Sequence, residues 1–274
     1  MATARLASAP VPARRALSDE TRGLLFFFLS LAIVLALWEA YVRFGFATKL
    51  LPAPSAVAGV AYDALKSPFY NNGENDKGIG LHLIASLGRV CIGFGIATIL
   101  AVPLGILLGL STVATRAIDP YVQILRPVSP LAWLPIGLAL FKSSQTTAIF
   151  VIAISSLWPI LLNTIFGVKA IPKIYLDVAR TLGTSRWETL RRIILPAAAP
   201  AIVAGLRVGI GIAWLVIIAA EMLTGGTGIG YYVWNEWNNL SISAIITAIL
   251  VIGGVGLGLD RLFAVLQSRV SYAE

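Results

Sequence analysis

The sequence predicts an all-α, polytopic membrane protein with about six transmembrane helices and one long charged loop. Two observations support this class. Of the 274 residues, 58% are hydrophobic and only 12% are charged, whereas soluble domains are about 45–50% apolar and about 25% charged. The apolar residues also occur in long blocks, and a helix needs about 20 such residues to cross a bilayer.

The N-terminal part predicts a tail, one membrane span and a loop. The tail, residues 1–22, is rich in Ala, Pro and Arg, and the first transmembrane helix is expected over residues 23–43. A signal peptide is the alternative, but the apolar block is too long and no small-residue cleavage site follows it. Residues 44–80 contain three Pro residues and the polar run NNGENDKG, which is typical of a loop outside the membrane.

Residues 81–268 predict the membrane core, and residues 269–274 a short C-terminal segment. A polar stretch, STVATRAIDP, separates the first two blocks of the core, and a charged loop over residues 169–199 separates the third from the fourth. Pro and Gly within spans are tolerated where neighbouring helices satisfy the freed backbone groups, so we expect helices packed around a polar path. The apolar blocks of the core cover about residues 81–110, 121–141, 146–168, 200–222 and 242–266.

The basic residues predict the orientation of the chain. With six spans both termini lie on one side, and that side then holds thirteen Lys and Arg residues, Arg261 among them, against five on the other side. Because cytoplasmic loops of membrane proteins are enriched in Lys and Arg, both termini and residues 169–199 are expected in the cytoplasm. The same bias explains the net charge of +8, so no nucleic-acid partner is expected.

Several kinds of site are excluded by the sequence. The chain has one Cys, Cys91, and one His, His82, so it holds no intrachain disulfide or Cys-built zinc site, and no metal site is expected. His82 is interpreted as a polar anchor at a helix end. The Gly-rich segment GGTGIG, residues 225–230, lacks the Lys of a phosphate-binding loop and is interpreted as an external turn. We therefore expect no ATPase site and no bound cofactor, and the chain is not expected to be an enzyme.

Glycines spaced four apart lie on one helix face and allow close approach of two helices. Such pairs occur in three spans, and two readings stay open for them: packing within one bundle, or contact with another subunit. The pairs are Gly105/Gly109, Gly205/Gly209 and Gly254/Gly258.

The charged loop contains signals for two short helices. Pro172 suits a first helical position, and Gly183 suits the left-handed residue that ends a helix. Ser185 and Glu188 have the spacing of a capping box at the start of the second helix, which is expected to end before Pro196. Trp187, Leu190 and Ile194 are expected on one apolar face. An interfacial helix whose arginines touch anionic lipid is the alternative.

The loop resembles the EAA signature of ABC-transporter permease subunits. That signature reads E-A-A, three residues, G, nine residues, I-x-L-P, and every gap is matched by Asp177-Val178-Ala179, Gly183 and Ile193-Ile194-Leu195-Pro196. Asp replaces Glu at 177 and Val replaces Ala at 178. The resemblance implies that the loop is a cytoplasmic coupling helix, which docks in a groove of a separate ATPase subunit. The residues implied to couple to the ATPase are Asp177, Ala179, Gly183, Ser185, Arg186, Trp187, Glu188, Leu195 and Pro196.

The resemblance extends over about residues 50–268 and covers most of the membrane core. SLGRVCIGFGIA, RPVSPLAWLPIGLALF and RVGIGIAWLVIIAAEMLTGGTGIG are similar to the subgroup that imports nitrate, sulfonates and related anions. NDKGIG and RPVSPLAWLPIGLALF are most similar to nitrate permeases. The resemblance implies the permease of a bacterial inner-membrane importer of nitrate and nitrite, with bicarbonate, cyanate or sulfonate as alternative cargo.

The same resemblance implies the partners of the chain. Two ATP-binding cassette ATPase subunits would hold the ATP and Mg, a second permease copy would complete the transporter as a homodimer, and a periplasmic or lipid-anchored protein would deliver the anion. An ATP-independent secondary carrier is the competing class, because such carriers also place ionisable groups at mid-membrane. We see no internal repeat of the kind that many carriers show.

Charged residues within spans are costly and usually face a partner or water. Arg89, Arg126 and Arg207 are therefore candidates for the anion path, although each could instead bond backbone carbonyls or extend to the interface. Arg207, Trp214 and Glu221 are spaced by sevens on one helix face, with the ends of this series about 21 Å apart at 1.5 Å per residue. Asn163 and Ser129 are further path candidates.

Overall fold

The computed structural model describes residues 19–45, 50–73 and 76–270, and these form helices joined by turns. The N-terminal tail up to residue 18 and the C-terminal residues 271–274 lie outside the described residues, so the expectations for both ends stay predictions. The chain divides into two compact units, Met1–Ala56 and Val57–Glu274. The described helices are α1 (Asp19–Arg43), α2 (Pro54–Lys66), α3 (Ile79–Leu110), α4 (Thr112–Leu125), η1 (Pro130–Trp133), α5 (Leu134–Phe141), α6 (Ser144–Lys169), α7 (Lys173–Thr181), α8 (Arg186–Thr189), η2 (Leu190–Ile194), α9 (Leu195–Thr224), α10 (Ile229–Asn238) and α11 (Ile242–Val270).

The all-α fold with about six spans is confirmed. Five helices have the length and apolar character needed to cross a membrane, and α4 together with η1 and α5 makes a sixth, bent by 91°. The bend falls where Pro127, Pro130 and Pro135 interrupt the apolar block, because Pro removes a backbone donor and disfavours helix in the residue before it. In the first unit, α1 exposes its apolar side chains around its whole circumference.

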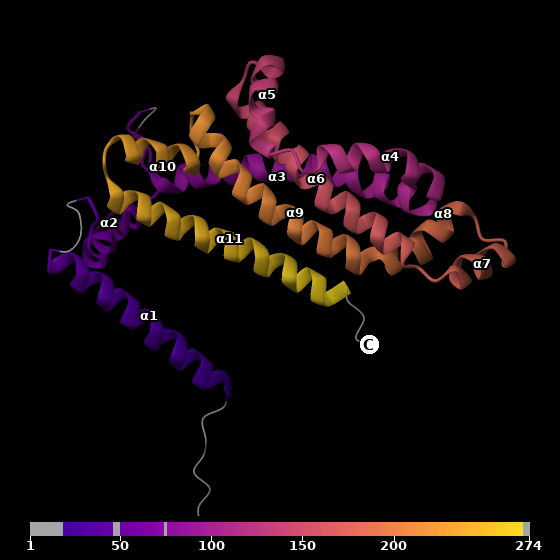
Figure 1. Ribbon diagram of the computed structural model, residues 1–274, viewed down its shortest axis with the longest axis horizontal. Coiled ribbons are helices and arrows are strands. Elements are labelled where there is room, and N and C mark those ends of the chain that lie inside the picture. Colours follow the sequence, from indigo (N-terminus) through magenta and orange to yellow (C-terminus); the bar gives the residue numbers. More distant parts are fainter. Residues whose placement is uncertain (1–18, 46–49, 74–75, 271–274) are drawn as a thin grey trace, which may run out of the picture. The chain divides into compact units, whose positions relative to one another are not determined.

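The second unit is built around α6, which packs against both α3 and α9, while α11 packs against α9. Figure 1 shows these helices side by side, with α7 and α8 at one end of this bundle and α10 at the other. The core contains buried β-branched side chains of α6 and α9, such as Ile152, Ile160 and Ile217. The apolar bundle therefore holds one group of polar residues at the end with α7 and α8, and another at the end with α10.

Two of the three glycine pairs pack inside the bundle. Gly105 and Gly109 face α6 so closely that a Cβ atom on either would collide with a side chain of that helix. The pair on α9 faces α6 as well, against Asn163 and Ile160. A Cβ atom added to Gly254 or Gly258 on α11 would meet none of the described residues within 4 Å, so the choice between packing and subunit contact stays open only for this third pair.

One expectation about helix bounds was wrong. The polar stretch after the first core block is not a connecting loop but the first half of α4, because Ser111 caps the helix by accepting a hydrogen bond from the Ala114 N–H at 3.2 Å. Arg261, which was counted with the cytoplasmic residues, lies inside α11, nine residues before that helix ends at Val270, and its side of the membrane stays a prediction.

Candidate functional site

The turn between α7 and α8 has the geometry that its sequence predicts. Pro172 is the N-cap residue of α7, one position before the expected one. Gly183 has φ +66°, a left-handed conformation that Gly adopts without a Cβ penalty. The Gly183 N–H donates to the Arg180 carbonyl and the Thr184 N–H to the Ala179 carbonyl, at 3.0 and 3.1 Å. This pair of bonds is the Schellman motif, which ends a helix sharply.

The start of α8 is fixed by the predicted capping box. The Ser185 Oγ accepts a hydrogen bond from the Glu188 N–H at 3.2 Å, and the Glu188 carboxylate accepts one from the Ser185 N–H at 3.4 Å. Two backbone donors at the helix start are thereby satisfied. Together with the Schellman motif, the box defines the angle between α7 and α8 from local residues alone.

The expectation that the second helix ends before Pro196 was wrong. The helix runs on from α8 through one π-helical turn, Leu190–Ile194, into α9, with Pro196 in the first turn of α9. The Leu195 N–H reaches back to the Leu190 carbonyl, five residues earlier instead of four. A π turn inserts one residue, and this wider turn accommodates the proline ring that would otherwise clash with a carbonyl of the preceding turn. The element that starts at α8 is therefore continuous with α9, a helix long and apolar enough to cross a membrane.

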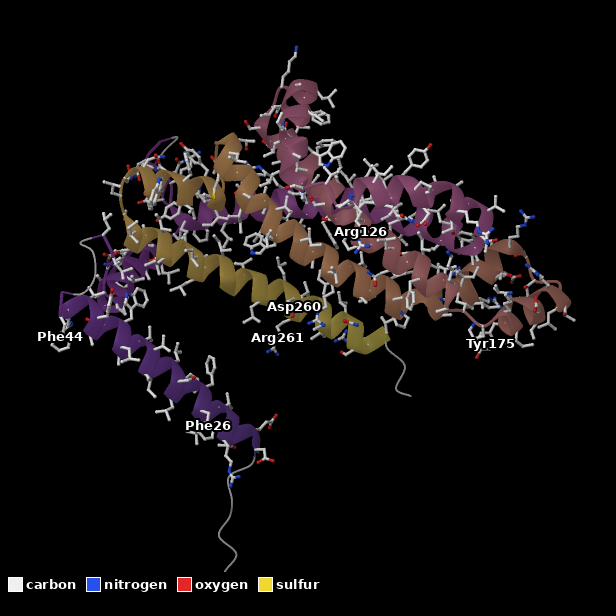
Figure 2. All side chains as sticks on the ribbon, in the orientation of Figure 1. Phe26, Phe44, Arg126, Tyr175, Asp260 and Arg261 are labelled. Carbon is white, nitrogen blue, oxygen red and sulfur yellow. The ribbon has the colours of Figure 1, made fainter. Side chains whose placement is uncertain are left out.

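Several large apolar side chains are exposed on this element, residues 172–196. Figure 2 shows Tyr175 on α7 at the end of the bundle, and Tyr175 is 55% exposed. The large exposed apolar side chains of the element are Ile174, Tyr175, Val178, Leu182 and Trp187. The predicted single face of α8 is divided: Trp187 is exposed, whereas Leu190 and Ile194 pack into the bundle. Leu190 and Ile194 therefore fix the element to the bundle, whereas Trp187 and the large apolar side chains of α7 stay exposed.

Charged side chains of the element are exposed as well. Asp177 contacts Arg180 at 3.5 Å, and Glu188 contacts Arg192 at 3.9 Å, with all four side chains largely exposed. Exposed pairs of this kind contribute about 0–1 kcal/mol to stability. Arg186 is exposed beside them, whereas Ala179 is buried and Leu195 is partly buried at the base. The predicted residues therefore lie together at one end of the bundle.

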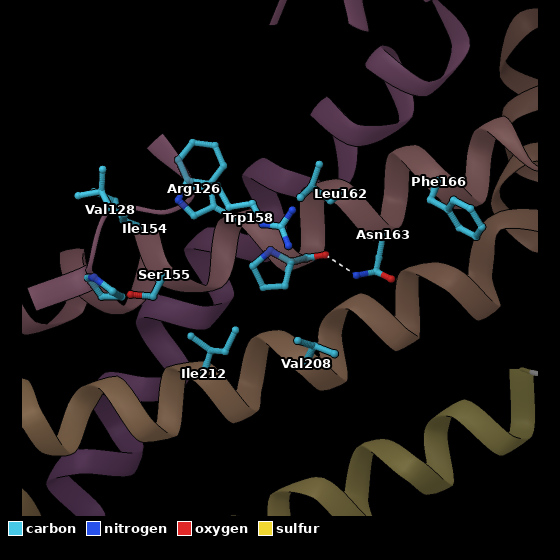
Figure 3. A pocket seen from close by; sticks show the side chains of 12 residues that line it. Arg126, Val128, Ile154, Ser155, Trp158, Leu162, Asn163, Phe166, Val208 and Ile212 are labelled. Carbon is cyan, nitrogen blue, oxygen red and sulfur yellow. Dashed lines mark hydrogen bonds between the residues drawn. The ribbon is translucent and has the colours of Figure 1, made fainter. Parts of the chain in front are cut away.

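A cavity of about 450 Å³ lies further along the bundle, between the segment after α4, α6 and α9. Arg126, Ser155, Trp158 and Asn163 line it, and Figure 3 shows them with Val208 and Ile212 of α9 across from them. The Asn163 amide donates to the Pro159 carbonyl at 2.8 Å. Arg126 is exposed and has no ion pair or hydrogen bond from its side chain among the described residues. An unpaired guanidinium in a cavity suits a small oxyanion.

A second cavity, of about 310 Å³, is lined by Arg89, Glu221, Gln145 and the turn after α9. Here Arg89 is paired: its Nη1 lies 2.6 Å from the Glu221 carboxylate, and the two side chains are 13% and 2% exposed. The carboxylate also accepts from the Ser86 Oγ at 2.8 Å and from the Gly230 N–H at 3.0 Å. The two predicted path residues Arg89 and Glu221 thus meet across α3 and α9.

The other two candidates on α9 face α11 and line neither cavity described above. Arg207 donates to both oxygens of Asp260, at 2.7 and 2.9 Å. The Trp214 indole donates to the Ile252 carbonyl at 3.0 Å. The expected separation of Arg207 and Glu221 therefore holds, since each has another partner. Ser129 is the N-cap residue of η1, next to cavity residues Val128 and Pro130.

Sequence reasoning missed Asp260 and Ser86. Asp260 could have been found, because an acid in one apolar span and an arginine in another span are expected to pair. Ser86 carries no such signal, since a serine in an apolar helix commonly bonds its own backbone. His82 lies in the first turn of α3 as expected, and its Nδ1 accepts a hydrogen bond from the Gly228 N–H at 3.0 Å.

Comparison with known proteins agrees with this architecture. Residues 101–272 match the family model described as "Binding-protein-dependent transport system inner membrane component". The chain is 44% identical over 246 residues to the nitrate import permease protein NrtB of Synechocystis sp., covering 90% of this chain and 89% of the relative. It is 45% identical over 236 residues to the bicarbonate transport system permease protein CmpB of Synechococcus elongatus, covering 85% and 84%.

More distant proteins share the same fold. The taurine transport system permease protein TauC of Escherichia coli is 31% identical over 243 residues, covering 88% of this chain and 87% of the relative. A chain of the MetNI methionine ABC transporter superposes with a TM-score of 0.60 at 15% identity, over 69% of this chain and 94% of that one. The protein is therefore a multi-pass membrane transport component, and it belongs to the inner-membrane permease family of binding-protein-dependent ABC transporters.

Proposed function

We propose that this chain is the membrane-spanning permease subunit of an ATP-driven importer of nitrate and nitrite in the bacterial inner membrane, with both termini in the cytoplasm. The observation that carries the proposal is the element at residues 172–196. It presents five exposed apolar side chains on a turn fixed by a Schellman motif and a capping box. An uncovered apolar surface with a rigid base is suited to docking into a groove of another protein.

The partners follow from the family and from the missing nucleotide site. The chain has no phosphate-binding loop, so the energy comes from two ATP-binding cassette subunits that bind ATP and Mg. A second copy of this chain completes the pathway, and a periplasmic or lipid-anchored protein delivers the anion. Because η2 and α9 continue from α8 without a break, movement of the docked element is transmitted directly to a membrane-spanning helix.

The mechanism is alternating access. ATP binding draws the two ATPase subunits together, and the docked elements then move the bundles so that the pathway opens outward. Hydrolysis reverses the movement and releases the anion inward. ATPase contacts that differ between the two states are required, because equal contacts would leave the equilibrium unchanged.

The cavity lined by Arg126 is the proposed binding site of the anion within the bundle. Its guanidinium offsets part of the hydration that an anion loses on entry, and Asn163 and Ser155 add polar groups beside it. Arg126→Gln should lower uptake at least ten-fold and leave the amount of protein in the membrane unchanged. Arg116→Gln, which removes an arginine of α4 that lies outside this cavity, is the matched control.

Nitrate is the first candidate, because relatives named nitrate import permeases are 42–47% identical and one of them matches over 90% of this chain. Bicarbonate is the second candidate, because relatives named bicarbonate permeases are about as similar, at 45–47%; cyanate and sulfonates come next. The test is uptake of labelled nitrate into proteoliposomes that hold the complete complex, with and without ATP, and with competing anions. ATP-independent uptake by the purified chain alone would show a secondary carrier instead.

A further inference from the structure

The end of the bundle opposite residues 172–196 holds a closely bonded polar cluster. It joins the first turns of α3 to the turn after α9 and to the start of α10. The cluster consists of His82, Ser86, Arg89, Glu221 and the backbone N–H groups of Gly228, Ile229 and Gly230. In the proposed orientation this is the outer end, where the delivery protein releases the anion.

The cluster fixes the turn by backbone donors. The N–H of Gly228 donates to His82, that of Ile229 to Ser86 at 2.8 Å, and that of Gly230 to Glu221. Gly228 and Gly230 leave no room for a side chain, since a Cβ atom would overlap the Glu221 carboxylate or the Ile218 carbonyl. This close approach explains the Gly-rich segment, which has no role in the proposed coupling.

Glu221 and Arg89 differ in how firmly they are held. Glu221 is fully enclosed and keeps two further partners, Ser86 and Gly230, if Arg89 leaves. Arg89 has five N–H donors, and within the described residues its side chain makes one bond, from Nη1 to Glu221. Arg89 is therefore the exchangeable member of the pair.

Arg89 also lines the adjoining cavity of about 310 Å³. One water molecule occupies about 30 Å³ in the liquid, so the cavity has room for a small oxyanion with part of its water shell. Gln145, Ser144 and Thr227 contribute polar groups to its wall, and the Lys77 ammonium bonds the Thr227 hydroxyl at 2.9 Å. The wall thus offers donors to an anion, while Glu221 neutralises the Arg89 charge.

We propose that the Arg89–Glu221 pair is an anion-responsive latch at the outer end of the bundle. A small oxyanion entering this cavity takes Arg89 from Glu221, and the link between α3 and α9 loosens. In the absence of an anion the pair re-forms, so that the cavity holds its anion weakly and passes it on. The inference rests on the proposed function, and it adds a second anion subsite and its regulation.

The test measures anion affinity in the complex of permease and ATPase subunits without the delivery protein. Sodium nitrate and sodium bicarbonate are titrated separately by calorimetry at constant ionic strength. Glu221→Gln keeps hydrogen bonds to Ser86 and Gly230 but removes the competing charge, so the affinity for the imported anion should rise at least ten-fold. Uptake at saturating substrate should fall several-fold, because the anion leaves more slowly. Glu236→Gln, on α10 outside the cavity, should change neither quantity.

Two results would overturn the latch. If the wild type and Glu221→Gln bind both anions with equal affinity, the pair has only a structural role. The same conclusion follows if the anion affinity is raised in Glu221→Gln and stays raised in the double variant Arg89→Gln, Glu221→Gln. Failure of the wild-type complex to import either anion would instead refute the proposed cargo. If Glu221→Gln fails to accumulate, Arg89→Lys gives the second measurement: it keeps the charge but loses the fork geometry, and an unchanged anion affinity and uptake would also reject the latch.

Discussion

The two ends of the bundle hold charged residues in opposite ways. At the end formed by α7 and α8, ion pairs join residues three or four positions apart and are exposed. At the end formed by α10, Glu221 is 2% exposed and its partner Arg89 is 132 residues away in the chain. Exposed pairs contribute about 0–1 kcal/mol, whereas removing one partner of a buried pair costs about 3–5 kcal/mol. The charged side chains at the first end are therefore available to a partner protein, whereas those at the second end stabilise the fold of the chain itself.

The contrast predicts the largest effect for a side chain forced into the buried end. Gly230→Ala would place a Cβ atom against the Ile218 carbonyl, which belongs to a helix backbone and cannot move aside. We expect the amount of folded protein in the membrane to fall at least ten-fold, measured by fluorescence-detected size exclusion. Gly211→Ala, on α9, would place its Cβ atom within 4 Å of none of the described residues and should accumulate normally. Normal accumulation of Gly230→Ala would show that the buried end is not rigid.

A change at the exposed end should instead separate transport from folding. Gly183→Pro forces φ to about −65° at a residue that has φ +66°, so α7 and α8 lose their relative orientation. Uptake and the stimulated ATPase rate should fall at least ten-fold, while the protein remains inserted at its normal level. Gly183→Asn, which tolerates the left-handed region, should retain most activity. Wild-type uptake by Gly183→Pro would refute the coupling role.

The ion pair of Arg207 and Asp260 is intermediate in burial between the pairs at the two ends of the bundle, since both side chains are partly exposed. Arg207→Met leaves the Asp260 carboxylate without its guanidinium partner inside a span, so we expect a several-fold loss of protein level. The double variant Arg207→Met, Asp260→Met should recover most of that level, because it removes both charges. Loss of uptake at normal protein level, without recovery in the double variant, would assign Arg207 to the anion path.

The smallest effect is expected for the helix cap at the exposed end. Ser185→Ala removes the hydroxyl that accepts from the Glu188 N–H, and loss of such a cap typically costs about 1 kcal/mol. The chain should insert normally, and its affinity for the ATPase subunits should drop by about five-fold at most, the same free energy expressed as a ratio. Ser185→Asp, which also caps helices, should restore the affinity. An unchanged affinity in Ser185→Ala would show that docking does not need a fixed α8.

The exposed end could be predicted well because its signals are local. Gly183, Ser185 and Glu188 act on backbone groups within a few residues, and each has the predicted geometry. The continuation through Pro196 was not predictable from these rules, because a π turn depends on how Leu190 and Ile194 pack into the bundle. The sequence analysis also did not predict the partner of Arg207, since Asp260 lies 53 residues further along the chain.

The sequence by itself determined the helical class, the approximate spans and the family resemblance, because long apolar blocks and a fixed motif spacing are properties of neighbouring residues. The tertiary structure decided which charges pair and which stay free. Arg89 and Arg126 both occur in apolar surroundings, but the packing of α3 against α9 gives Arg89 a carboxylate, whereas Arg126 faces a cavity. Pairing depends on distance in space, and no property of either arginine's own segment specifies it.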